Sequence, residues 1–370
     1  MSAANKPGKQ DKNMDETGDV QKSKKQLVFR IVNIVIVVSF GAFLVYYLLN
    51  QVDIADIKSA FLGMYRPTLI AALAIMLLSN LFRAYRKNIL VGSDRISMGD
   101  MFLVTMIRNA FNMVLPARTG ELSYIYVLTS RFHFPLEIGV STLMVVLIFD
   151  LVIVFSIILI SIIIVGINTY SISSASVILI SVALLAVSLI ILFFLSNIID
   201  MILIVYRKLL EKFKVKEGRP IYRIYSKVLD INNNLKIIRG RRIYWKVYLS
   251  SIVTRLLKFT SYYLIIHAIL APMGYSFSDL NYWVILLATI AAEISAVLPT
   301  HALAGFGTYQ GAFALAFVIL GFSEEISIIV GFSYHLVVLL FTVALGIIAM
   351  IIISMPFYRT SKERIRENKQ

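Results

Sequence analysis

The sequence predicts an all-α membrane protein whose helices cross the bilayer several times. Hydrophobic residues make up 59% of its 370 residues, whereas an ordinary soluble domain is about 45–50% apolar. They form long uninterrupted runs, such as 138–167 and 326–354. Transmembrane β-strands would instead show about ten residues of alternating polarity. Because backbone polar groups must be hydrogen-bonded internally in the bilayer, these runs predict a polytopic helical bundle.

Six apolar runs are predicted to be complete spans: 27–49, 67–82, 138–167, 177–197, 247–270 and 326–354. Two further apolar stretches, 101–132 and 282–320, are interrupted by proline and glycine. Residues 1–25 are polar and predict a disordered cytoplasmic tail. The transmembrane domain is expected to cover residues 26–356, and a basic cytoplasmic tail follows at 357–370.

The basic charge of the chain follows the predicted topology. The net charge is +15, and it lies between and beside the apolar runs, as expected from the positive-inside rule and from contact with an anionic membrane surface. We expect no nucleic-acid partner, because no recognition motif accompanies the charge. The rule places both termini and the basic segments 83–95 and 200–246 in the cytoplasm.

This orientation constrains the two interrupted stretches. Residues 101–132 must enter from the cytoplasm and return to it, and residues 282–320 must enter from the outside and return. Each stretch is therefore either a re-entrant helical hairpin or a pair of short spans. The basic loop 200–246 is either an interfacial amphipathic helix or only a determinant of topology.

The first interruption carries charged and amide side chains on one helix face. Arg108, Asn112 and Pro116 are spaced i, i+4, i+8 and share that face. Pro116 ends or kinks the helix because it cannot donate a backbone hydrogen bond. Gly120 permits a tight reversal, and Glu121 suits the positive end of the helix that follows.

The second interruption repeats this pattern, with Val-Leu-Pro ending at Pro299 and then Gly305, Gly307 and Thr308. Broken apolar segments at corresponding places in two halves of opposite orientation indicate a transporter with inverted repeats. Helix N-termini that meet inside the membrane form an anion site. A lipid phosphate is the natural ligand, because arginine binds phosphate through charge-assisted hydrogen bonds.

Two carboxylates, Asp150 and Glu293, lie deep within apolar context. An ionised carboxylate there is costly unless it faces the bundle interior and has a partner. The candidate partners are Arg108, Arg118, Arg255 and Lys258. Coupling to proton movement, a structural ion pair and a protonated acid all remain as alternatives at this point.

Signals of catalysis are weak. The absence of cysteine excludes disulfides and thiolate ligands, and the four histidines show no metal-ligand spacing. No P-loop, dinucleotide fingerprint or serine elbow is found, so we expect no metal, no cofactor and no catalytic residues. The predicted substrate-binding residues are Arg108, Asn109, Asn112, Arg118, Glu121, Asp150, Glu293, His301, Thr308 and Gln310.

One motif resembles a known family. The element Pro-Ala-Arg-Thr-Gly-Glu at 116–121, preceded by Asn109 and followed by Asp150, resembles the transmembrane region of the lysylphosphatidylglycerol synthase family. The Leu-Pro at 298–299 and the glycine break at 305–308 resemble it as well. The resemblance implies a membrane domain associated with lipid flipping, which in that family is accompanied by a separate cytosolic domain that aminoacylates phosphatidylglycerol.

The resemblance covers residues 27–354, and the sequence departs from the family pattern in two ways. The chain stops shortly after the last apolar run, so we expect it to lack the aminoacyltransferase domain and lysyl transfer. Gln310 stands where the resemblance implies an acidic residue.

The sequence therefore favours a flippase-like transporter in the plasma membrane that moves a phospholipid, a polyprenyl-type lipid or another phosphate-bearing lipid between leaflets. One alternative is the membrane component of an aminoacyl-lipid or glycolipid system that presents lipid to a partner transferase. Another alternative is a transporter of a small soluble anion.

Overall fold

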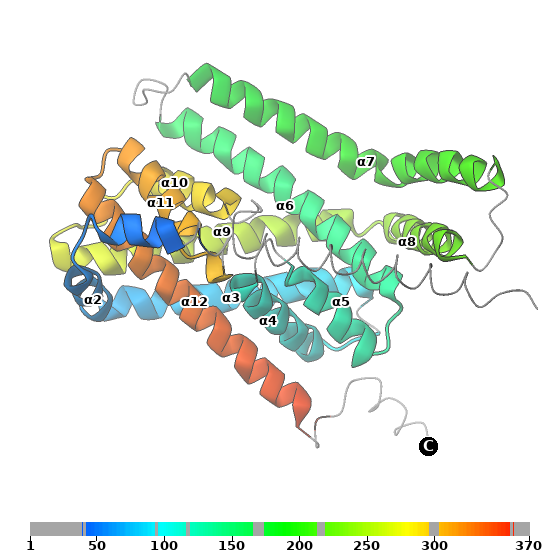
Figure 1. Cartoon of the computed structure of the whole chain (residues 1–370), viewed down its shortest axis with the longest axis horizontal. Coiled ribbons are helices and arrows are strands. Elements are labelled where there is room, and N and C mark those ends of the chain that lie inside the picture. Colours follow the sequence, from blue (N-terminus) through cyan, green and yellow to red (C-terminus); the bar gives the residue numbers. More distant parts are fainter. Residues whose placement is uncertain are drawn as a thin grey trace, which may run out of the picture.

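The computed structural model describes residues 39, 42–92, 95–115, 119–165, 174–212, 219–295, 303–355 and 358. Regular structure in this part of the chain is entirely helical (Figure 1). The α-helices are α2 (Ile54–Leu62), α3 (Arg66–Val91), α4 (Met98–Val114), α5 (Glu121–Ser130), α6 (Leu136–Val165), α7 (Ser174–Lys212), α8 (Pro220–Gly240), α9 (Tyr244–Leu270), α10 (Tyr282–Ser295), α11 (Thr308–Ile319) and α12 (Glu324–Ser354). Two short 3-10 helices are η3 (Ala271–Met273) and η4 (Leu303–Gly305).

Five of these helical segments are long and apolar enough to cross a membrane: Arg66–Val91, Leu136–Val165, Ile178–Lys212, Tyr244–Met273 and Glu324–Ser354. They correspond to five of the six complete spans predicted from the sequence. The prediction of a polytopic helical membrane protein is thus confirmed. Of the sixth predicted span, 27–49, the structure describes residues 39 and 42–49, and these are helical; the tails 1–25 and 357–370 lie outside the described residues except for residue 358.

Two predicted helix ends were wrong. Helix α3 continues to Val91 rather than ending at residue 82, and α7 continues to Lys212 rather than ending near 197. Residues 83–91 are therefore helical and are not part of a loop. The reason is that Arg86 and Lys87 are buried and Arg86 meets a carboxylate inside the bundle, so a hydropathy window ends the span too early.

Both interrupted stretches are helix–break–helix units. Helices α4 and α5 have 17 and 10 residues, and α10 and α11 have 14 and 12 residues. Each is shorter than the ~20 residues needed to cross ~30 Å of hydrocarbon. Figure 1 shows α10 and α11 near one end of the long axis and α4 and α5 nearer the other. These lengths and positions favour two re-entrant hairpins over pairs of complete spans.

The breaks rely on glycine. Gly305 and Gly307 have φ of 72° and 87°, a backbone region that side chains with a Cβ rarely adopt. At Gly120, a Cβ would lie 2.2 Å from the backbone nitrogen of Asn112, so α5 can turn against α4 only without one. The two predicted break prolines, Pro116 and Pro299, lie outside the described residues.

Packing places both hairpins against the long helices. Helix α3 lies along α9, α4 packs against α12, and α10 and α11 pack against each other and against α9 and α12 respectively. Gly346 on α12 approaches α4 so closely that a Cβ would lie 2.2 Å from the Cβ of Ala110. The largest cluster of buried apolar side chains joins α9 to α12, and includes Ile265, Leu286, Phe313 and Val330.

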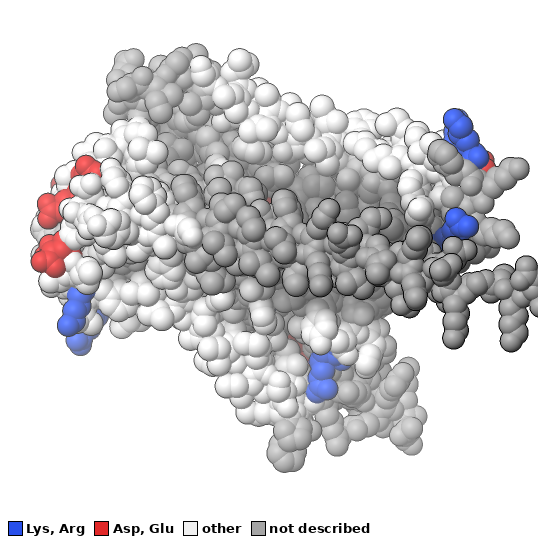
Figure 2. Space-filling view, viewed as in Figure 1, with Lys and Arg blue, Asp and Glu red and all other residues white. Residues whose placement is uncertain are grey.

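The basic segment 200–246 is largely helical where it is described, with a short non-helical connection between α8 and α9. Helix α8 packs on α6 and α7, with Asn232, Leu235 and Ile238 buried. Figure 2 shows acidic side chains gathered at the end of the molecule where α2 and the first turn of α12 lie. Basic side chains appear at the opposite end, near α7 and α8, and others lie beside the acidic group and toward the lower edge of the view. Contact of α8 with a membrane surface stays a prediction.

Candidate functional site

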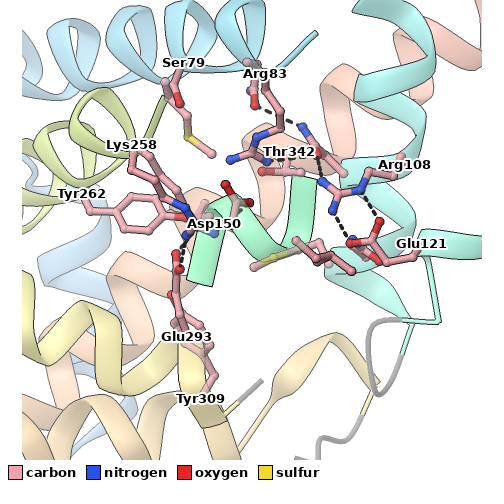
Figure 3. A pocket seen from close by; sticks show the side chains of 18 residues that line it. Ser79, Arg83, Arg108, Glu121, Asp150, Lys258, Tyr262, Glu293, Tyr309 and Thr342 are labelled. Atoms are coloured by element: carbon pink, nitrogen blue, oxygen red, sulfur yellow. Dashed lines mark hydrogen bonds and ion pairs between the residues drawn. The ribbon is translucent and has the colours of Figure 1, made fainter. Parts of the chain in front are cut away.

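A cavity of about 160 Å³ lies between the two hairpins and the long helices. Side chains from α3, α4, α5, α6, α9, α10, α11 and α12 line it (Figure 3). We call it the central cavity, and its charged lining residues are Arg83, Arg108, Glu121, Asp150, Arg255, Lys258 and Glu293. A site of this kind inside an apolar bundle is unusual, because each ionised side chain must find partners there.

The first hairpin closes one wall of the cavity with a two-pronged ion pair. Arg108 on α4 donates from Nε to Glu121 Oε2 at 2.7 Å and also pairs through Nη2 with Glu121 Oε1. Asn112, one turn after Arg108, donates to Glu121 Oε1 at 2.8 Å. Glu121 is the first residue of α5, so these bonds tie the two arms of the hairpin together across the break.

Asn109 links the same hairpin to α3. Its Oδ1 accepts hydrogen bonds from Arg83 Nη1 at 3.0 Å and from Arg108 Nη1 at 3.1 Å. Its Nδ2 donates to Asn80 Oδ1 at 3.1 Å. One amide oxygen therefore holds two guanidinium groups side by side at the cavity wall.

The opposite wall is a chain of ion pairs. Asp150 on α6 pairs with Arg86 at 2.5 Å and with Arg255 Nη2 at 3.0 Å. Glu293 on α10 pairs with Arg255 Nη1 at 3.1 Å and with Lys258. Arg255 thus bridges the two carboxylates and connects α6, α9 and the second hairpin. The attraction within such pairs offsets the cost of removing the charges from water, which an isolated buried charge would carry uncompensated.

Positive charge exceeds negative charge by one among the residues that line the cavity, and by two when Arg86, which pairs with Asp150 just outside the lining, is counted. The cations are Arg83, Arg86, Arg108, Arg255 and Lys258, and the carboxylates are Glu121, Asp150 and Glu293. Arg83 donates to the neutral Asn109 side chain, and in the described part of the chain it forms no ion pair. An anion that entered the cavity would find uncompensated charge and donors at Arg83.

Six predicted substrate-binding residues meet at this cavity: Arg108, Asn109, Asn112, Glu121, Asp150 and Glu293. Thr308 and Gln310 are buried nearby but do not line it. Gln310 Oε1 accepts the backbone N–H of Gly307 at 2.8 Å, and its Nε2 lies 2.6 Å from His335 Nδ1. Arg118 and His301 lie outside the described residues. Whether any of these side chains binds substrate stays a prediction.

Sequence reasoning missed the contribution of α3. Ser79, Asn80, Arg83 and Arg86 were not proposed as site residues, although the first three line the cavity and Arg86 pairs with Asp150. Their spacing of three and four residues places them along one helix face, which is the signal that would have found them. Arg255 and Lys258 were predicted as partners of the buried carboxylates, and the ion pairs confirm this.

Within the described ranges, no group of three or more histidine, aspartate or glutamate side chains is placed to hold an ion. The charged groups around the cavity are instead bonded to one another, mainly as arginine–carboxylate pairs.

The fold and the charged cavity define an integral membrane protein with a polar site between two broken helical hairpins. A family model described as the lysylphosphatidylglycerol synthase TM region matches residues 31–346. The chain belongs to this family, as the motif at 116–121 suggested, and the family links it to lipid handling. No curated protein matches the chain.

Proposed function

We propose that the protein is a flippase-like transporter that carries the headgroup of a phosphate-bearing lipid through the central cavity. The observation that carries the proposal is the excess of positive charge around a cavity lined by both hairpins. A headgroup phosphate supplies the missing negative charge. Arg83 and Arg108, held together by Asn109, offer it charge-assisted hydrogen bonds.

The physical difficulty of lipid movement is the headgroup, because the acyl chains never leave an apolar environment. A charged group at the bilayer centre is costly when no partner compensates it. The cavity replaces water around the phosphate with guanidinium donors. Because Arg108 is bonded to Glu121, a bound phosphate would compete with that carboxylate, and this exchange gives a route for release.

The two hairpins suggest how a lipid would enter the central cavity from each leaflet. Helix α4 contacts the η4 turn of the second hairpin, so the two hairpins approach each other inside the bundle. We infer that each hairpin opens the cavity to a different leaflet. The basic end near α7 and α8 is assigned to the cytoplasm of a plasma-membrane protein by the positive-inside rule, and α8 would then contact anionic headgroups.

A proteoliposome assay tests the proposal. Vesicles contain phosphatidylglycerol with a fluorescent headgroup, and a membrane-impermeant reductant bleaches the label in the outer leaflet. We expect protein to increase the fraction of label that becomes accessible with time. Arg83→Gln is expected to slow this exchange, whereas Arg223→Gln, an exposed arginine on α8, leaves it unchanged.

Equal transbilayer rates with and without protein, under several ion gradients, would overturn the transport proposal. Lipid binding without movement would instead favour presentation of lipid to a partner transferase. Competition by inorganic phosphate at the lipid's own concentration would favour a soluble anion as the substrate.

A further inference from the structure

A second hollow lies on the other side of the first hairpin. We call it the α5 groove. It has a volume of about 830 Å³, within the range of sites that hold small organic ligands. Its walls come from α4, α5 and the last turns of α12, and they include Phe111, Leu115, Leu122, Tyr126, Met350 and Ile353. The wall is mostly apolar, and Leu122 and Tyr126 are 65% and 71% exposed.

The α5 groove is distinct from the central cavity although the same hairpin forms a wall of both. On α4, Arg108 and Asn112 face the cavity, whereas Phe111 and Leu115 face the groove. At the start of α5, Glu121 lines the cavity and the next residue lines the groove. The hairpin therefore has one polar face and one apolar face, and a ligand in the groove would lie directly behind the proposed headgroup site.

Arg131 marks one end of the groove. It is the residue that follows α5, and it lines the hollow together with Ser354 and Met355 from the end of α12. Its Nη2 donates to the backbone oxygen of Tyr358 at 3.2 Å. Its Nε is buried and has no hydrogen-bond partner among the described residues. Buried donors in native proteins are almost always paired, so an acceptor is missing at this end.

We propose that the α5 groove binds a membrane phospholipid, with an acyl chain along α5 and the phosphate at Arg131. A phosphate oxygen would pair with the orphan Nε–H and neutralise the guanidinium. The length of α5 also matches an acyl chain. Its ten residues extend ~15 Å, which is half of the ~30 Å hydrocarbon core and so equals the depth of one leaflet. This inference rests on the proposed function in one respect: the bound lipid would be waiting to enter the central cavity.

The absence of cysteine from the chain makes a direct binding test possible. Leu122→Cys carries a fluorophore in the groove, and Ile190→Cys carries it on α7, where the side chain is 55% exposed outside the groove. The full-length protein is placed in nanodiscs with increasing amounts of brominated phosphatidylglycerol or of brominated diacylglycerol, which lacks the phosphate. Bromine on the acyl chains quenches only labels that it contacts.

The proposal predicts that the label at 122 is half-quenched at a roughly tenfold lower mole fraction of phosphatidylglycerol than the label at 190, the ratio expected for one charge-assisted hydrogen bond. Diacylglycerol should quench both labels equally. Arg131→Gln should remove the difference, and Arg131→Lys should keep part of it. Arg66→Gln, at an exposed arginine at the start of α3, should keep all of it.

Equal quenching at both positions, or a difference that survives Arg131→Gln in protein that elutes as a single species, would mean that the groove holds only bulk bilayer lipid and would overturn the proposal. The test requires no transport. If the groove selects phosphatidylglycerol but the protein does not flip lipid, the lipid site in the groove is supported and the proposed transport function is overturned. If the protein flips lipid but the groove shows no selectivity, the transport function is supported and the lipid site in the groove is overturned.

Discussion

The ion pair between Asp150 and Arg86 gives the sharpest test of how the bundle is held together. Asp150 contacts Arg86 and Arg255, and the Arg86 side chain is only 1% exposed. Replacing Asp150 by asparagine preserves shape but removes the negative charge that these two guanidinium groups share. Arg86 Nη1 can then donate only to neutral side-chain oxygens, the amide of the new asparagine and the Ser251 hydroxyl at 2.7 Å.

Removing one member of a buried pair costs about 3–5 kcal/mol because the other charge is left uncompensated. At a few degrees per kcal/mol, this corresponds to a fall in melting temperature on the order of 10 °C. The measurement is thermal unfolding of the full-length protein in detergent, followed by the loss of its monodisperse elution peak. The double variant Asp150→Asn with Arg86→Gln should recover much of the loss, because it no longer buries an unpaired arginine.

Asp230→Asn provides the matched control. The Asp230 carboxylate is 46% exposed and lies 4.0 Å from Lys227, so its loss should cost well under ~1 kcal/mol. The reasoning is refuted if Asp150→Asn melts like the wild type, or if the double variant is as unstable as the sum of the two single variants.

Three further predictions concern the close helix contacts and the cavity. Gly120→Ala should disrupt the first hairpin, because its Cβ would lie 2.2 Å from the α4 backbone, and this should change the elution profile and lower the melting temperature. Gly240→Ala is the control and should change neither, because a Cβ there meets nothing within 4 Å. Gly346→Ala should lower the melting temperature by several degrees, and adding Ala110→Gly should restore part of it; no restoration would show that α4 and α12 do not meet there. Arg83→Gln should weaken binding of a short-chain phosphatidylglycerol roughly tenfold without loss of stability, measured by microscale thermophoresis; unchanged affinity would remove Arg83 from the site.

The parts of the fold that local rules govern could be predicted from the sequence. Long apolar runs gave the spans, and glycine with proline gave the two breaks. The spacing of Arg108 and Asn112 placed both on one face of α4, and both line the cavity. A carboxylate in the middle of an apolar run must face inward, and Asp150 and Glu293 do so.

The contribution of α3 could not be predicted in the same way. Arg86 and its partner Asp150 are separated by 64 residues, and nothing local to either residue states that they meet. A charged cluster at the end of an apolar run is ordinarily read as the membrane boundary. Only the packing of α3 along α9 shows that the helix continues and that Arg83 turns toward the cavity.

The central claim is that a lipid phosphate occupies the cavity between the hairpins. A cryo-electron microscopy map of the protein in nanodiscs that contain phosphatidylglycerol tests it most directly. The account predicts phosphate density within hydrogen-bond distance of the Arg83 and Arg108 guanidinium groups, with the acyl chains leaving between the helices. Lipid phosphates found only at the bilayer surfaces, with the cavity holding none, would contradict it.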